Sequence, residues 1–177
     1  MKTRFLALAI AALFAGPALA APAGTGSLTI GGVQTDMELL GEGTINGLNL
    51  KYQFEPAGSR VGFIGSFTYA SGSDRIEQAG SRPVDLDLRY YSLALGPSYR
   101  IAPAVSLYGV VGFAGSKAET NTASVSDNFE PVVGAGVRVF PFADLVFDAY
   151  YEKASGLSSG RSRVDADTFS LGLGYSF

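Results

Sequence analysis

The side chains best able to do chemistry in this chain are charged or amide groups, because its 177 residues include neither histidine nor cysteine. Without these two residue types the usual general base, the commonest metal ligand and any thiol nucleophile are missing. We therefore expect no catalytic residue, no metal site and no cofactor. Groups of opposite sign can still pair where water is excluded, which predicts an internal polar network. The polar residues that interrupt apolar runs are Asn49, Lys51, Gln53, Glu55, Tyr108, Arg138, Asp148 and Glu152.

Five basic residues lie in or beside stretches rich in glycine, serine and aspartate: Arg75, Arg82, Lys153, Arg161 and Arg163. Guanidinium and ammonium groups bind phosphate and sulfate oxygens through charge-assisted hydrogen bonds. Arg161 and Arg163, separated by one serine, are the best candidates for contacting an anionic partner. The alternative is a solvated surface, since isolated exposed charges add little binding energy. No nucleic-acid partner is expected, because the net charge of the chain is −3.

Alternation of residue types identifies the elements that must position these groups. From Leu48 to Glu55 apolar and polar residues interleave without error, and from Phe169 to Phe177 large residues alternate with small ones. On a β-strand such residues fall on opposite faces, whereas an amphipathic helix repeats every three or four residues. The chain is therefore expected to be all-β.

Proline and clusters of small polar residues divide the chain into hairpins. Three short breaks, at residues 56–59, 102–104 and 141–144, each carry a proline and indicate tight turns. The longer polar stretches are expected to be loops. They lie near residues 35–46, 71–83, 118–130 and 154–166.

Three turns alternating with four loops predict eight antiparallel strands, with both chain ends on the side of the short turns. Most of these strands have the roughly 9 to 11 residues that a tilted strand needs to cross a bilayer. Short turns on one side and longer loops on the other are typical of a barrel that spans an outer membrane. The expected strands are 26–34, 47–55, 60–70, 84–100, 105–117, 131–140, 145–153 and 167–177.

The expected strand 84–100 has an irregular pattern. Its apolar residues occupy even positions as far as Tyr90 and odd positions from Tyr91 onward. One strand cannot place both sets on the same face. We expect the membrane band to begin near Tyr91, with a β-bulge or the extracellular end of the strand absorbing the mismatch.

The N-terminal residues 1–20 have the features of a secretory signal peptide. A positive head and a short apolar run precede an A-x-A cleavage site that ends at Ala20. The apolar run is shorter than the roughly 20 residues of a membrane-spanning helix. We expect cleavage after Ala20, which leaves residues 21–177 as one exported domain.

Alternation alone does not say whether the apolar face meets lipid or a soluble core, and a soluble barrel of the lipocalin type would share the pattern. The polar face, however, carries mid-strand charges that are costly in lipid and tolerated inside a narrow barrel. Tyrosine and phenylalanine gather toward strand ends on the other face, as in interfacial girdles. Eight strands enclose room only for side chains, so no channel is expected. The residues expected to face lipid are Leu48, Leu50, Tyr52, Phe54, Phe67, Tyr69, Leu107, Val111, Phe113, Val137, Phe147 and Tyr151.

Seven short runs of the sequence, in order, carry a family resemblance over all but the first expected strand: residues 47–52, 64–69, 90–92, 96–101, 106–112, 134–137 and 172–177. Together they resemble the Ail/Lom/OmpX family of outer-membrane proteins. The resemblance implies an eight-stranded antiparallel transmembrane up-and-down β-barrel in the outer membrane of a Gram-negative bacterium, with extracellular loops and periplasmic turns. It also implies that the barrel-assembly machinery reads the last strand. The residues that would carry this signal are Phe169, Leu171, Leu173, Tyr175 and Phe177.

The same resemblance implies a role at the cell surface. Family members serve as adhesins or invasins, protect against complement or support envelope integrity, and they act through their loops. The implied partners are outer-membrane lipid and lipopolysaccharide, the assembly machinery, and host surface or matrix proteins. A purely structural envelope protein is the main alternative. A lipid-modifying barrel enzyme is a remote one, because a histidine-dependent site cannot be assembled from this sequence.

Overall fold

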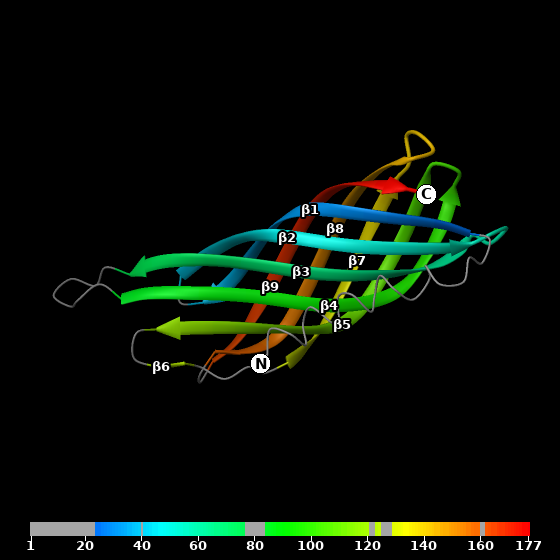
Figure 1. Cartoon of the computed structure of the whole chain (residues 1–177). Helices are drawn as coiled ribbons and strands as arrows, with labels where there is room; N and C mark the ends of the chain where they lie inside the picture. The colour runs from blue at the N-terminus through cyan, green and yellow to red at the C-terminus, as the bar shows by residue number, and fades with distance from the viewer. Residues whose placement is uncertain (1–23, 40, 77–83, 121–122, 125–128, 160–161) are drawn as a thin grey trace, which may run out of the picture.

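The computed structural model describes residues 24–39, 41–76, 84–120, 123–124, 129–159 and 162–177 (Figure 1). The expected signal peptide lies outside the described residues. Within them, no helix is long and apolar enough to span a membrane. The strands are β1 (Gly24–Leu39), β2 (Gly41–Pro56), β3 (Val61–Ile76), β4 (Val84–Ala102), β5 (Val105–Thr120), β6 (Ala123–Ser124), β7 (Phe129–Val139), β8 (Leu145–Ser159) and β9 (Ser162–Ser176).

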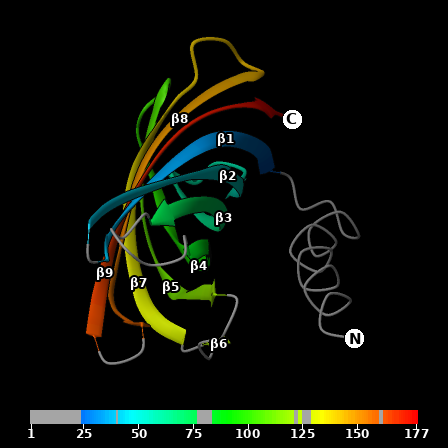
Figure 2. The same ribbon diagram turned by 90° about the vertical axis from the view of Figure 1, so that its left-hand side faces the viewer.

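The eight long strands form one closed antiparallel sheet. Each pairs with its neighbours in chain order, β4 pairs with β5, and β1 pairs with β9 to complete the circle. The two-residue strand β6 pairs only with the end of β5. Figures 1 and 2 show strongly tilted strands that curve around a common interior. The prediction of an eight-stranded up-and-down barrel is confirmed.

Backbone hydrogen bonds between the two ends of the described chain close the sheet. The Gly26 N–H donates to the Phe177 carbonyl at 2.8 Å, and the Phe177 N–H donates to the Gly26 carbonyl at 2.8 Å. Both ends lie beside the short turns at 57–60, 103–104 and 140–144, as predicted. In outer-membrane barrels this side is the periplasmic one.

The long polar stretches contain far more strand than the sequence predicts. β1 to β5 each have 16 to 19 residues and β8 and β9 have 15, compared with the roughly 9 to 11 needed to cross a bilayer. The loop predicted over 35–46 is wrong, because only residue 40 separates β1 from β2. Beyond the apolar band the outward positions carry exposed polar residues such as Gln34 and Asp36, so the strand continues without an apolar outer face.

Of the two explanations given for the irregular pattern of strand 84–100, the β-bulge is wrong, whereas the extracellular end of the strand has side chains outside the described ones. The register of β4 with β3 is unbroken from Val84 to Tyr99, and its pairing with β5 shifts only between Arg100 and Ala102. Alternation is regular where burial is described, with Tyr90 buried and Tyr91 turned outward. Tyr90 adds to the mismatch because it is a large residue on the inner face, while the side chains of Leu86 and Leu88 lie outside those that the structure describes.

Candidate functional site

The interior of the barrel centres on the carboxylate of Asp148. Lys51 on β2 donates to its Oδ1 at 2.5 Å, and Nε of Arg138 on β7 donates to its Oδ2 at 2.9 Å. The hydroxyl of Tyr108 on β5 donates to the same carboxylate at 3.0 Å. All four side chains are buried. One carboxylate therefore joins two cations from different walls of the barrel.

The guanidinium of Arg138 also binds β1, the strand that closes the barrel by pairing with β9. Nη1 donates to Ser27 Oγ and Nη2 to Thr29 Oγ1, each at 2.9 Å. Three acceptors on β1 and β8 thus satisfy a side chain with no solvent exposure. A buried guanidinium needs such partners to offset its desolvation.

Glu152 forms a second centre, toward the end of the barrel away from the chain ends. The hydroxyls of Tyr90 on β4 and Tyr150 on β8 donate to its two carboxylate oxygens at 2.7 and 2.5 Å. Nζ of Lys51 lies 4.3 Å from the centroid of the Tyr150 ring, a cation–π distance. Lys51 therefore connects the two centres.

Two glycines on β7 make room for the aromatic residues of this network. The rings of Tyr108 and Tyr150 stack at 5.9 Å. A Cβ at Gly136 would lie 2.3 Å from the Tyr108 ring, and one at Gly134 would lie 2.5 Å from the Tyr150 hydroxyl. The lumen thus holds two tyrosines because the facing wall has no side chains there.

A third ion pair lies at the end of the barrel beside the short turns. Arg100 on β4 donates through Nε to Oε2 of Glu55 at 2.7 Å and through Nη1 to the carbonyl of Pro103 at 2.9 Å. Its guanidinium carbon lies 4.3 Å from the centroid of the Phe140 ring. Gln53 donates to Oε1 of Glu55 at 2.5 Å. These contacts line the mouth of the barrel at the end of the short turns.

The structure brings the predicted lumen residues together inside the barrel. Asn49, which stands apart from the ion pairs, donates to Ser66 Oγ at 3.0 Å and to Thr68 Oγ1 at 2.8 Å. Sequence reasoning missed Tyr90, Tyr150 and Arg100. The sequence could have identified Tyr150 as a lumen residue, since it lies between Asp148 and Glu152 in the same phase of the strand.

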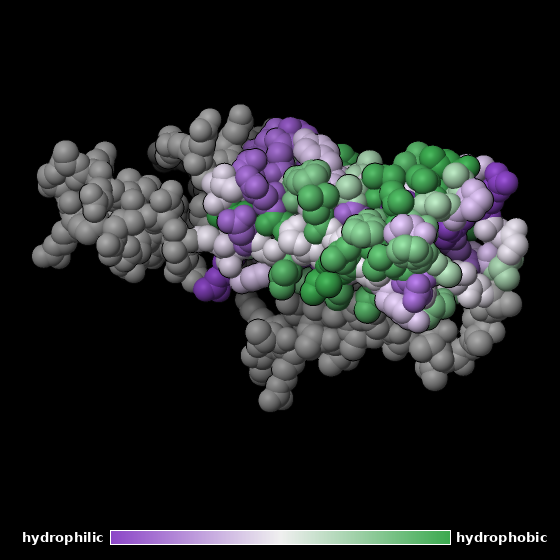
Figure 3. Space-filling model, turned by 90° about the horizontal axis from the view of Figure 1, so that it is seen from above, coloured by the Kyte–Doolittle hydropathy of each residue, from purple (hydrophilic) through white to green (hydrophobic). Residues whose placement is uncertain are grey.

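The residues predicted to face lipid all lie on the outside, and none is buried. Val111 is 67% exposed and Phe113 63%, values typical of residues outside a core. Figure 3 shows apolar side chains gathered over a broad part of the surface, with polar ones toward its margins.

Aromatic residues form a row across the outer surface, where the outward positions change from apolar to polar. Leu48, Tyr69, Tyr91, Gly115 and Phe129 occupy successive register positions from β2 to β7. The ring of Tyr91 covers Gly115 and meets Phe129 edge-on at 6.0 Å. From Tyr91 to Tyr99 the strand spans about 26 Å, or about 20 Å across a membrane at 40° tilt. This height is close to, though slightly below, the roughly 25 Å apolar band of barrels that span an outer membrane.

The candidate loop contacts fall into three groups. Lys153 lies on β8 and pairs with Asp167 at 3.3 Å and Asp165 at 4.0 Å, so carboxylates already neutralise it. Arg75 lies on β3 opposite Asp85, and Arg163 on β9 opposite Ser158. Arg82 and Arg161 lie outside the described residues.

The chain matches the family model described as outer membrane protein beta-barrel domain over residues 5–177. It is 36% identical to outer membrane protein X of Enterobacter cloacae, over 96% of this chain and 95% of that one. It is 35% identical to the attachment invasion locus protein of Yersinia enterocolitica, over 85% of each chain. The chain belongs to the Ail/OmpX family of outer-membrane β-barrels.

Membership of this family confirms the resemblance seen in the sequence, and it makes the protein an integral outer-membrane barrel of a Gram-negative bacterium. A solved relative is Ail of Yersinia pestis in complex with the heparin analogue sucrose octasulfate. Its structure superposes with a TM-score of 0.71 at 33% identity, covering 88% of this chain and 99% of that one. The apolar outer band of this barrel therefore lies in a lipid environment.

Proposed function

We propose that this family member is a surface-binding protein whose hairpins engage anionic polymers outside the cell. The observation that carries the proposal is the extension of the barrel wall past the aromatic row, which raises the hairpin ends away from the membrane. Relatives named for attachment and invasion, and one solved with a heparin analogue, support the proposal. Lipopolysaccharide and host surface or matrix proteins are the proposed partners.

The hairpin between β8 and β9 is the proposed contact point. Ser159 pairs with Ser162 at its end, and Arg163 follows directly on β9. Arg161 lies outside the described residues, but only Ser162 separates it from Arg163 in the sequence, so we assign the contact with sulfate or phosphate oxygens to these two guanidinium groups. Lys153 is a poorer candidate, because Asp165 and Asp167 compete with any external anion.

Binding of whole cells to immobilised heparin tests this assignment. Replacing both Arg161 and Arg163 with alanine should reduce binding at least threefold, whereas replacing both with lysine keeps the charge and should retain most of it. Heat-dependent gel mobility shows whether each variant forms a barrel. Unchanged binding by the double alanine variant would reject the proposed contact.

The remaining roles are proposed from the residues themselves. Lys51, Arg138, Asp148 and Glu152 would plug the lumen, because the ion pairs of the first three and the tyrosine hydrogen bonds of Glu152 fill the narrow interior of an eight-stranded barrel. The assembly machinery would read the large apolar side chains of β9 and of the terminal Phe177, and cleavage after Ala20 would release the mature chain. Phe169, Leu171, Leu173, Tyr175 and Phe177 share the outer face of that strand.

A structural envelope protein is the second candidate, and the tightly joined interior favours it because a stable barrel could support the membrane without any ligand. The arginine variants separate the two functions. They should lose heparin binding and keep normal resistance to detergent, whereas a purely structural protein would show no binding to lose. The absence of histidine from the sequence argues against the enzymatic alternative.

A further inference from the structure

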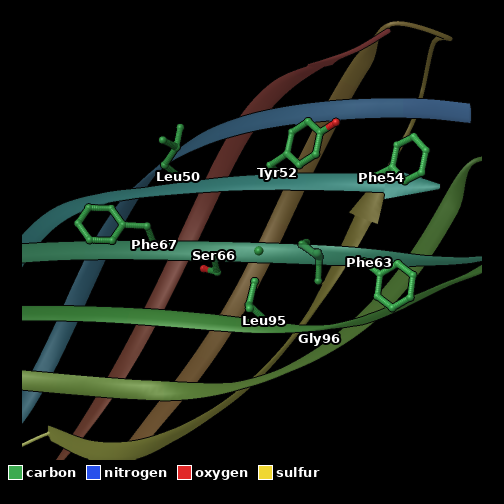
Figure 4. A pocket seen from close by; sticks show the side chains of 10 residues that line it. Leu50, Tyr52, Phe54, Phe63, Ser66, Phe67, Leu95 and Gly96 are labelled. Carbon is green, nitrogen blue, oxygen red and sulfur yellow. The ribbon is translucent and has the colours of Figure 1, made fainter. Parts of the chain in front are cut away.

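A groove in the outer surface lies at the level of Gly65, over β2, β3 and β4. Gly65 shares the outward phase of Phe63 and Phe67, and it is paired with Tyr52 on one side and Leu95 on the other. The position therefore has no side chain where four large neighbours do. Figure 4 shows the gap left between them. Its volume is about 290 Å³, and its walls include Leu50, Tyr52, Phe54, Phe63, Phe67 and Leu95.

The groove runs toward the periplasmic mouth of the barrel. Phe54 and Phe63 pair with one another next to the turn at 57–60. Gly65 lies four residues from Val61 at the start of β3 and four from Tyr69 in the aromatic row, so it stands near the middle of the apolar band. The groove thus extends from mid-membrane toward the periplasmic interface.

A cation stands at the periplasmic end of this groove. Arg60 is exposed in the turn that leads into β3, and no described residue forms an ion pair or side-chain hydrogen bond with it. Arg100, the other arginine near the described turns, is already held by Glu55. Arg89 at the opposite end of the band also has partners. Of these three arginines with described side chains, Arg60 on the periplasmic side is therefore the one available to an external anion.

We propose that this groove binds one phospholipid of the periplasmic leaflet, with an acyl chain over Gly65 and the phosphate at Arg60. Five residues of strand separate the two positions, about 17 Å along β3 and about 13 Å along the membrane normal at 40° tilt. One leaflet of a hydrocarbon core is about 15 Å thick. An extended chain held by its headgroup at Arg60 therefore ends at the gap. The inference depends on membrane insertion and is independent of any loop ligand.

Tryptophan fluorescence offers a direct test, because the chain contains no tryptophan. Phe63→Trp places a single reporter in the groove wall. Leu107→Trp is the matched control, since Leu107 is also an exposed apolar residue two positions from a periplasmic strand end, on β5, and it does not line the groove. Both variants are reconstituted in phosphatidylcholine vesicles with increasing amounts of brominated phosphatidylglycerol, which quenches tryptophan on contact.

The Phe63→Trp reporter should reach half-maximal quenching at a mole fraction of brominated lipid at least threefold lower than the control. Adding Gly65→Leu should fill the gap and abolish this difference, and adding Arg60→Gln should remove the preference for the anionic headgroup. Gel mobility before and after boiling shows that each variant is a folded barrel, and Gly65→Val replaces any leucine variant that does not insert.

Three results would overturn the proposal. Equal quenching of the two reporters would mean that the groove holds lipid no better than the rest of the surface. An unchanged curve for Gly65→Leu would remove the gap from the explanation. Protection of the Phe63→Trp reporter from all brominated lipids, together with crosslinking between barrels, would identify a second copy of the chain as the occupant. Heparin binding is unaffected in each case.

Discussion

Lys51 and Asp148 form an ion pair inside the barrel, with 2.5 Å between Nζ and Oδ1, although 97 positions separate them in the chain. The pair joins β2 to β8 across the lumen, and Arg138 shares the same carboxylate. The carboxylate of Asp148 compensates the charges of Lys51 and Arg138, and these two cations compensate the charge of the carboxylate. Removing one charge therefore affects groups on three strands.

Replacing Asp148 by asparagine should strongly destabilise the barrel. Lys51 and Arg138 would remain buried without a counter-charge, which costs about 3–5 kcal/mol for a broken buried pair. Urea unfolding of the protein in lipid vesicles measures the change. Asp144→Asn, an exposed carboxylate in a turn, is the control and should be close to neutral. A loss below about 1 kcal/mol for Asp148→Asn would contradict the proposed importance of the network.

A methyl group at Gly136 should be poorly tolerated. It would lie 2.3 Å from the Tyr108 ring, so Gly136→Ala must displace a stacked tyrosine and should cost about 1–3 kcal/mol, as overpacking does. At Gly109 on β5 the nearest atom would be 3.9 Å from the added carbon. The unfolding midpoint of Gly109→Ala should thus stay near that of the parent protein. Equal midpoints for Gly136→Ala and Gly109→Ala would contradict the prediction that Gly136 makes room for Tyr108.

An arginine at Val111 distinguishes lipid from water outside the barrel. Val111 is 67% exposed, so in water the change would be nearly neutral, whereas at mid-membrane it should cost about 2–4 kcal/mol. Asn46→Arg, two residues beyond Leu48 on the polar side of the aromatic row, should have little effect. Equilibrium unfolding in vesicles measures the free energy of unfolding of each variant. A similar loss of free energy for Val111→Arg and Asn46→Arg would count against the assigned membrane band.

Two variants of Phe177 separate recognition during assembly from closure of the sheet. Phe177→Ala keeps the backbone hydrogen bonds to Gly26, and deletion of the residue removes them. If the assembly machinery reads the ring, both variants should lower the amount of folded barrel in cells several-fold. In vesicles without the machinery, only the deletion should slow refolding. Normal cellular yield of Phe177→Ala would exclude a recognition role for the ring.

The reconstituted barrel should not conduct ions above background in a planar bilayer. The side chains of Arg138, Tyr150 and Glu152 are fully or almost fully buried in the interior, and eight strands leave no space around such groups. Single-channel recording is the measurement, with a known porin as the positive control. Steady conductance steps would show that the network opens.

The membrane part of the fold could be predicted from the sequence because each strand there has one apolar face. Lys51 and Tyr52 were assigned to opposite sides from alternation alone, and the structure buries the first and exposes part of the second. The extended hairpins could not be predicted in this way. Thr35 is buried beside Thr168, with 2.9 Å between their hydroxyl oxygens, but its exposed neighbours are polar, so the segment resembles a loop.

The contacts of the lumen network were not readable from the sequence either. Alternation places Arg138, Asp148 and Glu152 inside, but it does not say which carboxylate meets which cation, because that depends on how the strands are staggered around the barrel. Tyr90 was misread for a related reason. A large aromatic residue is expected outside a small membrane barrel, and the hydrogen bond to Glu152, which the sequence does not reveal, helps to explain its place inside.

The pairing of Gly26 with Phe177 also constrains how the molecule can be made. Until β9 has been synthesised, β1 has no partner on one side, and a product that lacks β9 exposes an unpaired strand edge that invites aggregation. Folding that proceeds from the N-terminus as the chain emerges cannot finish such a ring. The ring can therefore close only after the whole chain has been made, when its first and last strands are held together.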